Sequence, residues 1–336
     1  MNTIGKRLTL TTAGESHGPA LVGILDGFPS QVRIDMEAVQ HELDRRHPAA
    51  PGTTARRELD RLQVLSGIFE GVTTGGPIAL LINNVDARPG DYDALRDVYR
   101  PGHADYTYAA KYGVRDHRGG GRASARETAL RVAAGAFALQ ALEQRGIRVS
   151  AYTSCIGSIN HPVEHPVDMT DIYSRPMRSA DADTDAAMAQ LVSSIAADGD
   201  SIGGIVSGRI SGLCAGVGEP VYDKFQAMLA SAMMSINAAK GFDYGTGFEG
   251  VDRPGSQIAA VTGGICGGIT DGGDITFRVA FKPVATMMRP LECRKADGST
   301  VTITPGGRHD ACIVPRAVAV VRAMAALTTL DALLLK

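Results

Sequence analysis

The stretch KYGVRDHRGGGRASAR, residues 111–126, places six side chains that are cationic or can become so around three consecutive glycines. Its end, Ser124-Ala125-Arg126-Glu127, has the pattern of a capping box, in which a serine and a glutamate satisfy free backbone N–H groups at a helix start. Apolar residues then recur at helical spacing from Ala129 to Leu139, and this stripe stops by Gly146. The stretch therefore predicts a glycine-rich loop that leads directly into a helix N-terminus.

A loop of this kind is suited to binding an anion. Backbone N–H groups without covering side chains and the positive end of a helix dipole both favour negative charge, and arginines add planar, bidentate donors. The stretch is neither a Walker A loop nor a GxGxxG turn after a strand, which disfavours a nucleotide kinase and a dinucleotide-binding unit. The alternative interpretation of the charge pattern is a solvated basic loop.

The composition limits the class of protein. The 336 residues carry 34 Lys and Arg against 36 Asp and Glu, so there is none of the basic excess that a nucleic-acid-binding protein usually has. The five cysteines show no CxxC spacing and indicate free thiols in a reducing compartment. There is no signal-peptide core and no uncharged apolar run of membrane-spanning length. We therefore expect a soluble, cytoplasmic protein without nucleic-acid or membrane partners.

Hydrophobic periodicity predicts the secondary structure coarsely. Strands and helices do not alternate regularly, which favours the α+β class over a parallel doubly wound sheet. No internal repeat or linker divides the chain, so residues 1–336 are expected to form a single domain. A long polar stretch at 83–121 shows little periodicity and is expected to be a functional loop. The predicted strands are 7–12, 20–25, 63–68, 78–82, 202–210 and 275–281, and the predicted helices are 35–46, 129–146, 185–196, 220–237 and 316–335.

Three histidines lie in short polar or glycine-containing segments. His17 follows Gly14-Glu15-Ser16, His103 follows Arg100-Pro101-Gly102, and His309 stands between Arg308 and Asp310. Such an accessible histidine can act as a proton donor, although a lone histidine is more often structural. The segment HPVEH at 161–165 matches a zinc-peptidase pattern that requires a helix, but Pro162 and Pro166 oppose helical geometry. We therefore expect no metal site there.

Four longer stretches together resemble the chorismate synthase family, in that family's order. The resemblance covers essentially the whole chain, from Asn2 to about Leu335. These stretches are GESHGPALVGILDGFP at 14–29, RPGHADYTYAAKYGVRDHRGGGRASARET at 100–128, GEPVYDKFQAMLASAMMSINAAKG at 218–241 and GGRHDACIVPRAVAVV at 306–321.

The resemblance implies a lyase that binds reduced FMN and 5-enolpyruvylshikimate 3-phosphate. It eliminates phosphate and a ring proton (an anti-1,4-elimination) and releases chorismate, the last common step of the shikimate pathway to aromatic amino acids. It also implies a homotetramer of single-domain subunits with helices sandwiched between antiparallel sheets, and NADPH as an external reductant. The alternative is a flavin- or phosphate-binding homologue that has lost catalysis.

The resemblance also assigns roles to individual residues. His17 matches the histidine that protonates the leaving phosphate, His103 the one that protonates reduced flavin, and Asp310 a carboxylate that helps to remove the ring proton through the flavin. Arg46 matches a substrate-binding arginine, and Arg45, Arg118 and Arg126 are further candidate anion ligands. The implied flavin contacts are Arg122, Ala123, Ser124, Asn237, Ala238, Gly267, Lys282, Pro283, Val284, Ala285, Thr286 and Arg308.

Two implied flavin segments differ from the usual family pattern. Ala123 stands where the family usually has serine, and KPVAT at 282–286 stands for the usual KPTSS. If those family contacts use hydroxyl groups, each loss should weaken flavin binding by about 1 kcal/mol, the net worth of a hydrogen bond. If they use the backbone, the replacements should have little effect.

Overall fold

The computed structural model describes residues 1–47, 60–85, 89–161, 169, 172–260, 262–304 and 310–336. Within these residues, six α-helices lie with two five-stranded sheets, and three smaller sheets flank them. The helices are α1 (Met36–Asp44), α2 (Asp105–Tyr112), α3 (Thr128–Glu143), α4 (Ala182–Ala197), α5 (Phe225–Met234) and α6 (Val314–Leu335).

The first large sheet comes from the N-terminal part of the chain. Its strands are β1 (Thr3–Ile4), β2 (Thr9–Ala13), β3 (Ala20–Asp26), β7 (Ile78–Asn83) and β4 (Leu62–Val64), antiparallel in that order. The two predicted N-terminal strands are confirmed as the pair β2 and β3. The predicted strand at 63–68 is wrong, because Gly67 takes a positive φ of 85° and divides it between β4 and β5 (Ile68–Phe69).

The second large sheet is built from strands that follow α3 in the chain. Its antiparallel order is β10 (Ile159–Asn160), β9 (Arg148–Ile156), β11 (Gly204–Ser211), β15 (Ile275–Phe281) and β12 (Ala239–Tyr244). The predicted strands 202–210 and 275–281 are confirmed as the neighbours β11 and β15. The sequence prediction missed β9 and β12.

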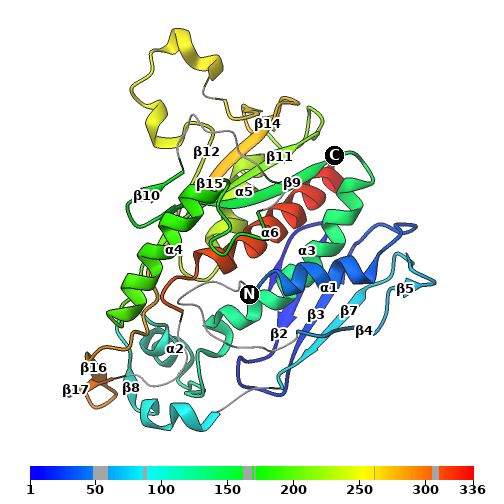
Figure 1. Cartoon of the computed structure of the whole chain (residues 1–336). Helices are drawn as coiled ribbons and strands as arrows, with labels where there is room; N and C mark the ends of the chain where they lie inside the picture. Colours follow the sequence, from blue (N-terminus) through cyan, green and yellow to red (C-terminus); the bar gives the residue numbers. More distant parts are fainter. Residues whose placement is uncertain (48–59, 86–88, 162–168, 170–171, 261, 305–309) are drawn as a thin grey trace.

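Helices α3 and α6 lie between the two large sheets (Figure 1). Helix α3 packs on β2, β3 and β7, helix α6 packs on β9 and β11, and the two helices pack on each other. They meet at Gly135, where an added Cβ would lie 2.4 Å from the Cβ of Ala323. The absence of a side chain at Gly135 therefore allows the close approach. This layering confirms the predicted α+β class with helices between antiparallel sheets.

The polar stretch 83–121 is more ordered than a loop. It contains the 3-10 segment η1 (Pro89–Leu95), strand β8 (Val98–Tyr99) and helix α2. Strand β8 joins a three-stranded sheet with β16 (Leu291–Lys295) and β17 (Thr300–Ile303). The expectation of a long loop is therefore wrong, and the segment is a small subassembly beside the helix layer.

The remaining elements complete the chain. The carboxylate of Asp35 accepts from the backbone N–H groups of Glu37 and Ala38 and so caps α1, as predicted. Helix α5 is shorter than the predicted 220–237, because turns occupy both of its flanks. The other short elements are β6 (Val72–Thr73), which pairs with β5, the hairpin β13 (Ile265–Cys266) and β14 (Ile269–Thr270), and the 3-10 segments η4 (Gly247–Gly250) and η5 (Gly255–Ala260).

Helix α6 is long and apolar enough to cross a membrane by length and composition, although Arg316, Arg322 and Asp331 interrupt its apolar run. However, 78% of its most apolar window is buried inside the protein. Its position between α3 and the second sheet accounts for that apolar composition (Figure 1).

Candidate active site

The glycine-rich loop turns more tightly than the sequence predicts. Gly119 and Gly121 have positive φ angles of 83° and 53°, which favour glycine. Two 3-10 turns, η2 (Gly121–Ala123) and η3 (Ala125–Glu127), then separate the loop from α3. The predicted direct entry from the loop into an α-helix is therefore corrected to an entry through two tight turns.

The predicted capping box is only half present. The Ser124 hydroxyl accepts from the backbone N–H of Arg126 at 3.3 Å. Glu127 instead accepts from Thr12 Oγ1 at 2.9 Å and from Arg131 Nε at 2.8 Å. A buried carboxylate gains more from a charged guanidinium one helical turn away than from a neutral N–H, which explains the difference.

A cavity of about 550 Å³ opens beside the loop. It is lined by all three glycines of the loop and by residues from β2, from the turn after it and from α2. Among the lining side chains are Glu15, His103, Tyr108, Tyr112 and Arg122. The cavity thus combines exposed backbone, two candidate site residues and a partly apolar wall, as a small-molecule site requires.

His103 is held by a buried carboxylate. Its Nδ1 lies 2.9 Å from Asp105 Oδ1 and 3.1 Å from Arg100 Nη2, and Asp105 is only 2% exposed. Both contacts are made by Nδ1, so they fix the ring through that nitrogen, and Nε2 is the other ring nitrogen. A histidine arranged in this way is oriented for proton transfer at Nε2.

Two arginines share the same carboxylate. Arg100 Nε contacts Asp105 Oδ2 at 2.8 Å, and Arg115 Nη1 contacts Asp105 Oδ1 at 2.6 Å. Burial alone would raise the pKa of Asp105, but His103 and Arg100 hold that pKa well below its usual range. Arg100 Nη2 also donates to the carbonyl of Gly119 at 3.3 Å. The His103 cluster is therefore tied directly to the glycine-rich loop.

His17 lies against Gly119. Its Nδ1 is 3.0 Å from Ser16 Oγ, and its ring meets the edge of Tyr92 with 4.8 Å between centroids. A Cβ placed on Gly119 would stand 2.3 Å from His17 Nδ1. The fold thus links two histidines that are far apart in the sequence to one glycine: His17 lies against it, and His103 is connected to its carbonyl through Arg100.

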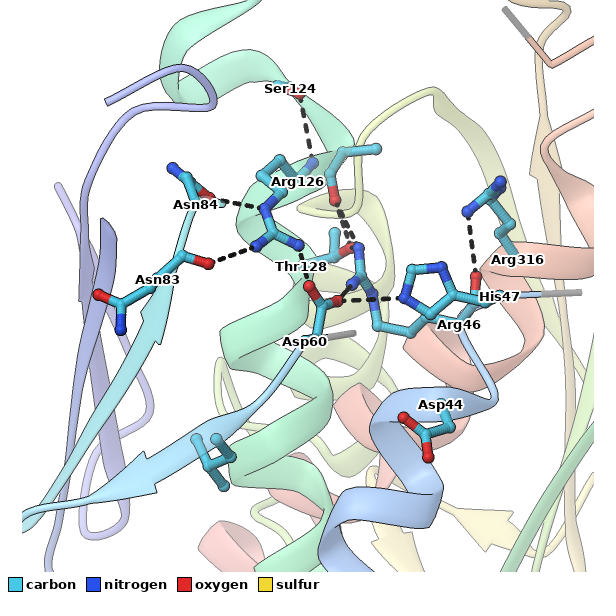
Figure 2. A network of polar contacts seen from close by, with 12 residues as sticks. Asp44, Arg46, His47, Asp60, Asn83, Asn84, Ser124, Arg126, Thr128 and Arg316 are labelled. Atoms are coloured by element: carbon cyan, nitrogen blue, oxygen red, sulfur yellow. Dashed lines mark hydrogen bonds and ion pairs between the residues drawn. The ribbon is translucent and has the colours of Figure 1, made fainter. Parts of the chain in front are cut away.

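A second cluster is built around Asp60, which is fully buried (Figure 2). Arg46 Nη1 and Arg126 Nη1 each pair with one of its carboxylate oxygens, and His47 Nε2 lies 3.4 Å away. Arg46 Nη2 also donates to Ala125 O and to Thr128 Oγ1, both at 3.2 Å. The structure thus joins two of the predicted substrate arginines on one carboxylate.

The charges in this cluster affect one another. Burial lowers the pKa of Arg46 to about 10; nearby Asp60 opposes that change, and Arg126 and Arg316 add to it. Burial would raise the pKa of Asp60, but His47, Arg46 and Arg126 hold that pKa well below its usual range. Two guanidinium groups on one carboxylate leave a local excess of positive charge.

Asp310 is linked to the Asp60 cluster through Arg316. Arg316 Nε pairs with Asp310 Oδ2 at 2.9 Å. Arg316 Nη1 donates to the main-chain carbonyl of Arg46 at 3.3 Å, as Figure 2 shows. Asp310 is therefore fixed relative to Arg46, although 264 positions separate the two residues in the sequence.

The other two candidate substrate arginines are paired locally. Arg45 forms an ion pair with Glu42 and stacks over the ring of Tyr173 at 3.9 Å. Arg118 forms a bidentate pair with Asp116, which lines the cavity, and its side chain is half exposed. Arg118 thus lies at the rim of the cavity. Arg45 is the sequence neighbour of Arg46, but its side chain contacts Glu42 and Tyr173 and not Asp60 among the described residues.

Part of the predicted flavin set gathers beside the cavity. Asn237 Nδ2 donates to Ala123 O at 2.8 Å, and Arg122 Nη2 donates to Thr12 Oγ1 at 2.8 Å. Two buried atoms, Arg122 Nη1 and Asn237 Oδ1, have no hydrogen-bond partner within the described residues. Such atoms are costly to bury alone, so a ligand that pairs with them would be stabilised.

A second part of that set lies against the His103 segment. Lys282 Nζ donates to Gly102 O at 3.3 Å, and Ala285 Cβ would lie 3.8 Å from a Cβ on Gly102. Lys282 N donates to Ala238 O at 3.0 Å. The carbonyl of Val284 accepts from Ser201 Oγ at 2.9 Å. Pro283 is exposed and Thr286 is half-buried in the same segment.

Several predicted positions are not joined to the cavity. Gly267 occupies the turn between β13 and β14, and none of the contacts in the described part of the chain connects it to His103 or Arg122. Arg308 lies outside the described residues, as do residues 162–165 of the HPVEH segment. Among the residues that the structure describes, no cluster of three or more His, Cys, Asp or Glu side chains could hold a metal ion.

The residues that hold these groups in place are not among the candidates from the sequence. Arg100, Asp105, Asp60 and Asn84 connect segments that are distant in the chain, and no local motif identifies them. A buried acidic side chain is unusual unless it is paired with a cation. An aspartate just before a strand, as at Asp60, would have been the sequence signal for such a residue. Only the three-dimensional arrangement supplies the partners.

Comparisons with known proteins agree on one family. A sequence profile described as chorismate synthase matches residues 8–334. The chain is 48% identical over 350 residues to a chorismate synthase of Bacteroides fragilis strain YCH46, which covers 99% of this chain and 98% of that protein. It is 44% identical over 347 residues to one from Opitutus terrae, with 98% and 96% covered. A solved structure entitled "Crystal Structure of Chorismate Synthase" superposes with a TM-score of 0.77 at 30% identity, over 98% of this chain and 92% of that one.

Proposed function

This chain belongs to the chorismate synthase family, and from that premise we propose that the cavity beside Gly119–Gly121 binds its cofactor and its substrate. The enzyme is a lyase that converts 5-enolpyruvylshikimate 3-phosphate to chorismate with loss of phosphate and a ring proton. The observation that carries the proposal is the link of His17 and, through Arg100, of His103 to Gly119, with Arg122 lining the same cavity as His103.

The residues beside the cavity fit reduced FMN. Arg122 Nη1 is a buried donor suited to a phosphate oxygen, and Asn237 Oδ1 is a buried acceptor suited to a ring N–H. The adjoining segments 122–124, 237–238 and 282–286 would hold the rest of the cofactor. When bound, reduced flavin would supply electron density to the substrate as phosphate departs.

The chain's own residues would handle protons and charge. His17 would donate a proton to the leaving phosphate, and His103 would hold the proton needed near the flavin, with its ring orientation set by Asp105. Asp310 would assist removal of the ring proton. Arg46 and Arg126 would present their excess positive charge toward the substrate carboxylates and phosphate, with Arg45 and Arg118 nearby.

The proposal also covers the domain organisation, the oligomeric state, the location and the reductant of the protein. We treat residues 1–336 as one domain, supported by the packing of α3 on α6 between the sheets. A homotetramer is supported by the apolar side chains of Val22 and Ile24, which are 40% and 37% exposed on the outer face of the first sheet. Free cysteines fit a cytoplasmic location, and NADPH is proposed as the external reductant on family grounds alone.

One anaerobic assay tests the function. Purified protein is mixed with chemically reduced FMN and 5-enolpyruvylshikimate 3-phosphate, and chorismate is measured, with oxidised or omitted FMN as the control. Chorismate that appears only with reduced FMN supports the proposal. No chorismate, while flavin and substrate still bind, would instead favour a binding protein that has lost catalysis.

A further inference from the structure

The side chain of Asn84 bridges the segment that carries His17 and the helix start that carries Arg126. Its Nδ2 donates to the carbonyls of Glu15 at 3.1 Å and Gly18 at 2.8 Å. Its Oδ1 accepts from Arg126 Nε at 2.9 Å (Figure 2). Because carbonyls only accept and a guanidinium only donates, these partners assign the amide orientation. Asn84 thus fixes the turn that holds His17 relative to Arg126.

Asp60 continues the connection on the far side of Arg126. It pairs with Arg126 through one carboxylate oxygen and with Arg46 through the other. All three side chains are buried: Asp60 is 0%, Arg126 6% and Arg46 9% exposed. Water therefore competes poorly for these contacts, and a buried charged network of this kind is much stiffer than a surface ion pair.

The connection ends at Asp310. The main-chain carbonyl of Arg46 accepts from Arg316, and Arg316 pairs with Asp310. One continuous series of polar contacts therefore runs from the His17 turn through Asn84, Arg126, Asp60, Arg46 and Arg316 to Asp310. Its two ends are the groups assigned to the departing phosphate and to the departing ring proton.

We propose that Asp60 and Asn84 are positioning residues that set the placement of His17 relative to Asp310, an inference that rests on the function proposed above. An elimination in which two groups leave from different atoms of one ring needs its proton donor and its base at a fixed separation. A misplacement of about 1 Å can cost about 100-fold in rate, so the residues that fix this separation matter although they touch no substrate.

The first test compares two adjacent asparagines. Asn84→Ala removes the bridge, whereas Asn83→Ala removes an exposed side chain that points away from the network, since Asn83 contacts Arg126 only through its main-chain carbonyl (Figure 2). We expect Asn84→Ala to lower kcat by about tenfold or more, a fraction of the cost of a full misplacement. FMN affinity should stay unchanged, and Asn83→Ala should match the unsubstituted enzyme.

The second test compares two buried aspartates. Asp60→Asn keeps the size of the side chain and removes the charge that holds both arginines. Asp331→Asn is the matched control, because Asp331 is 3% exposed and, among the described residues, accepts hydrogen bonds from the backbone N–H groups of Lys6, Arg7 and Leu8. Both variants should lower the thermal midpoint, but only Asp60→Asn should lower kcat at saturating substrate and flavin.

Double-mutant cycles separate positioning from stability. If Asn84 acts through His17, then Asn84→Ala added to His17→Ala should cost almost nothing further, because the interaction has already been lost. Full additivity of the two losses, or kcat of Asn84→Ala equal to that of Asn83→Ala below the thermal transition, would overturn the inference. If Asp60→Asn does not fold, the asparagine pair decides the question.

The assay of the unsubstituted enzyme distinguishes the two levels of failure. Absence of chorismate from that enzyme contradicts the proposed function itself. Chorismate from that enzyme, together with unchanged turnover in Asn84→Ala, contradicts only the positioning role.

Discussion

Gly119 lies directly against the imidazole of His17. A Cβ on Gly119 would stand 2.3 Å from His17 Nδ1, well inside van der Waals contact, and the residue has a positive φ of 83°. The carbonyl of the same residue accepts from Arg100, which also pairs with Asp105 beside His103. Gly119 is thus linked to both candidate acid histidines. Its lack of a side chain is required for two reasons, the contact with His17 and the positive φ.

Gly119→Ala should therefore impair turnover more than it impairs folding. The added methyl group must displace His17 or the loop, in addition to the strain of a positive φ in alanine, which is about 1 kcal/mol. Steady-state kinetics and thermal unfolding together check this. Gly146→Ala is the control, because Gly146 has φ of 76° but nothing within 4 Å of an added Cβ. Equal kinetics in the two variants would show that the contact with His17 has no role in turnover.

The location of this site was partly predictable from the sequence. The glycine cluster and the serine cap of the following turn are local signals, and both are present at the predicted residues. Helix α2 escaped prediction because its eight residues have little apolar periodicity and are anchored by ion pairs from Asp105 to Arg100 and Arg115. A helix that depends on such tertiary contacts leaves no amphipathic pattern in the sequence.

His103→Ala should leave folding and substrate binding largely intact and lower turnover by about 100-fold or more, as for the loss of a general acid. His103 lines the cavity and is held by Asp105, so its removal subtracts a positioned proton donor. The pH dependence of kcat and circular dichroism spectra are the measurements. His41→Ala, at an exposed position of α1, serves as the control. Turnover near that of the unsubstituted enzyme would remove His103 from the mechanism.

Asp105 should make the protein sensitive to acid. Its pKa in the folded state lies well below that of an unfolded aspartate, which is about 3.9. A carboxylate with a depressed folded-state pKa contributes stability that is complete above the unfolded pKa and is lost as pH falls toward the folded pKa. Urea unfolding between neutral pH and pH 3 should therefore show a free energy of unfolding that decreases as the solution is acidified.

Substitution separates Asp105 from the other carboxylates. Asp105→Asn should lower the free energy of unfolding at neutral pH by about 3–5 kcal/mol, since Arg100 and Arg115 lose their buried counter-charge, and it should flatten the acid dependence. Asp252→Asn, at an exposed position, should change neither quantity. An acid dependence as steep in Asp105→Asn as in the unsubstituted protein would mean that other groups cause it.

The Asp60 cluster shows why the rest of the site could not be predicted. Arg46 and Arg126 stand out as candidate anion ligands, yet their shared partner lies 14 and 66 positions away along the chain. Nothing in the sequence around Asp60 specifies that pairing. It arises because β4 and β7 are neighbours in the first sheet, and this places Asp60, just before β4, near Asn83 and Asn84 at the end of β7.

Asn237 should be a determinant of flavin affinity. Its Nδ2 is used by the carbonyl of Ala123, while its buried Oδ1 has no partner within the described residues, so that atom can accept a hydrogen bond from a bound N–H. Asn237→Leu should change the stability of the ligand-free protein little, because it removes a made bond and an unsatisfied acceptor together. It should weaken binding of reduced FMN by about tenfold, which corresponds to one lost hydrogen bond. Anaerobic titration of the variant gives the dissociation constant.

Ala123→Ser is the matched control. The contact uses the main-chain carbonyl of Ala123, so restoring the hydroxyl usual in the family should leave the affinity for reduced FMN unchanged. Tighter binding in Ala123→Ser would instead place a hydroxyl contact at this position, and unchanged affinity in Asn237→Leu would move the flavin away from Asn237.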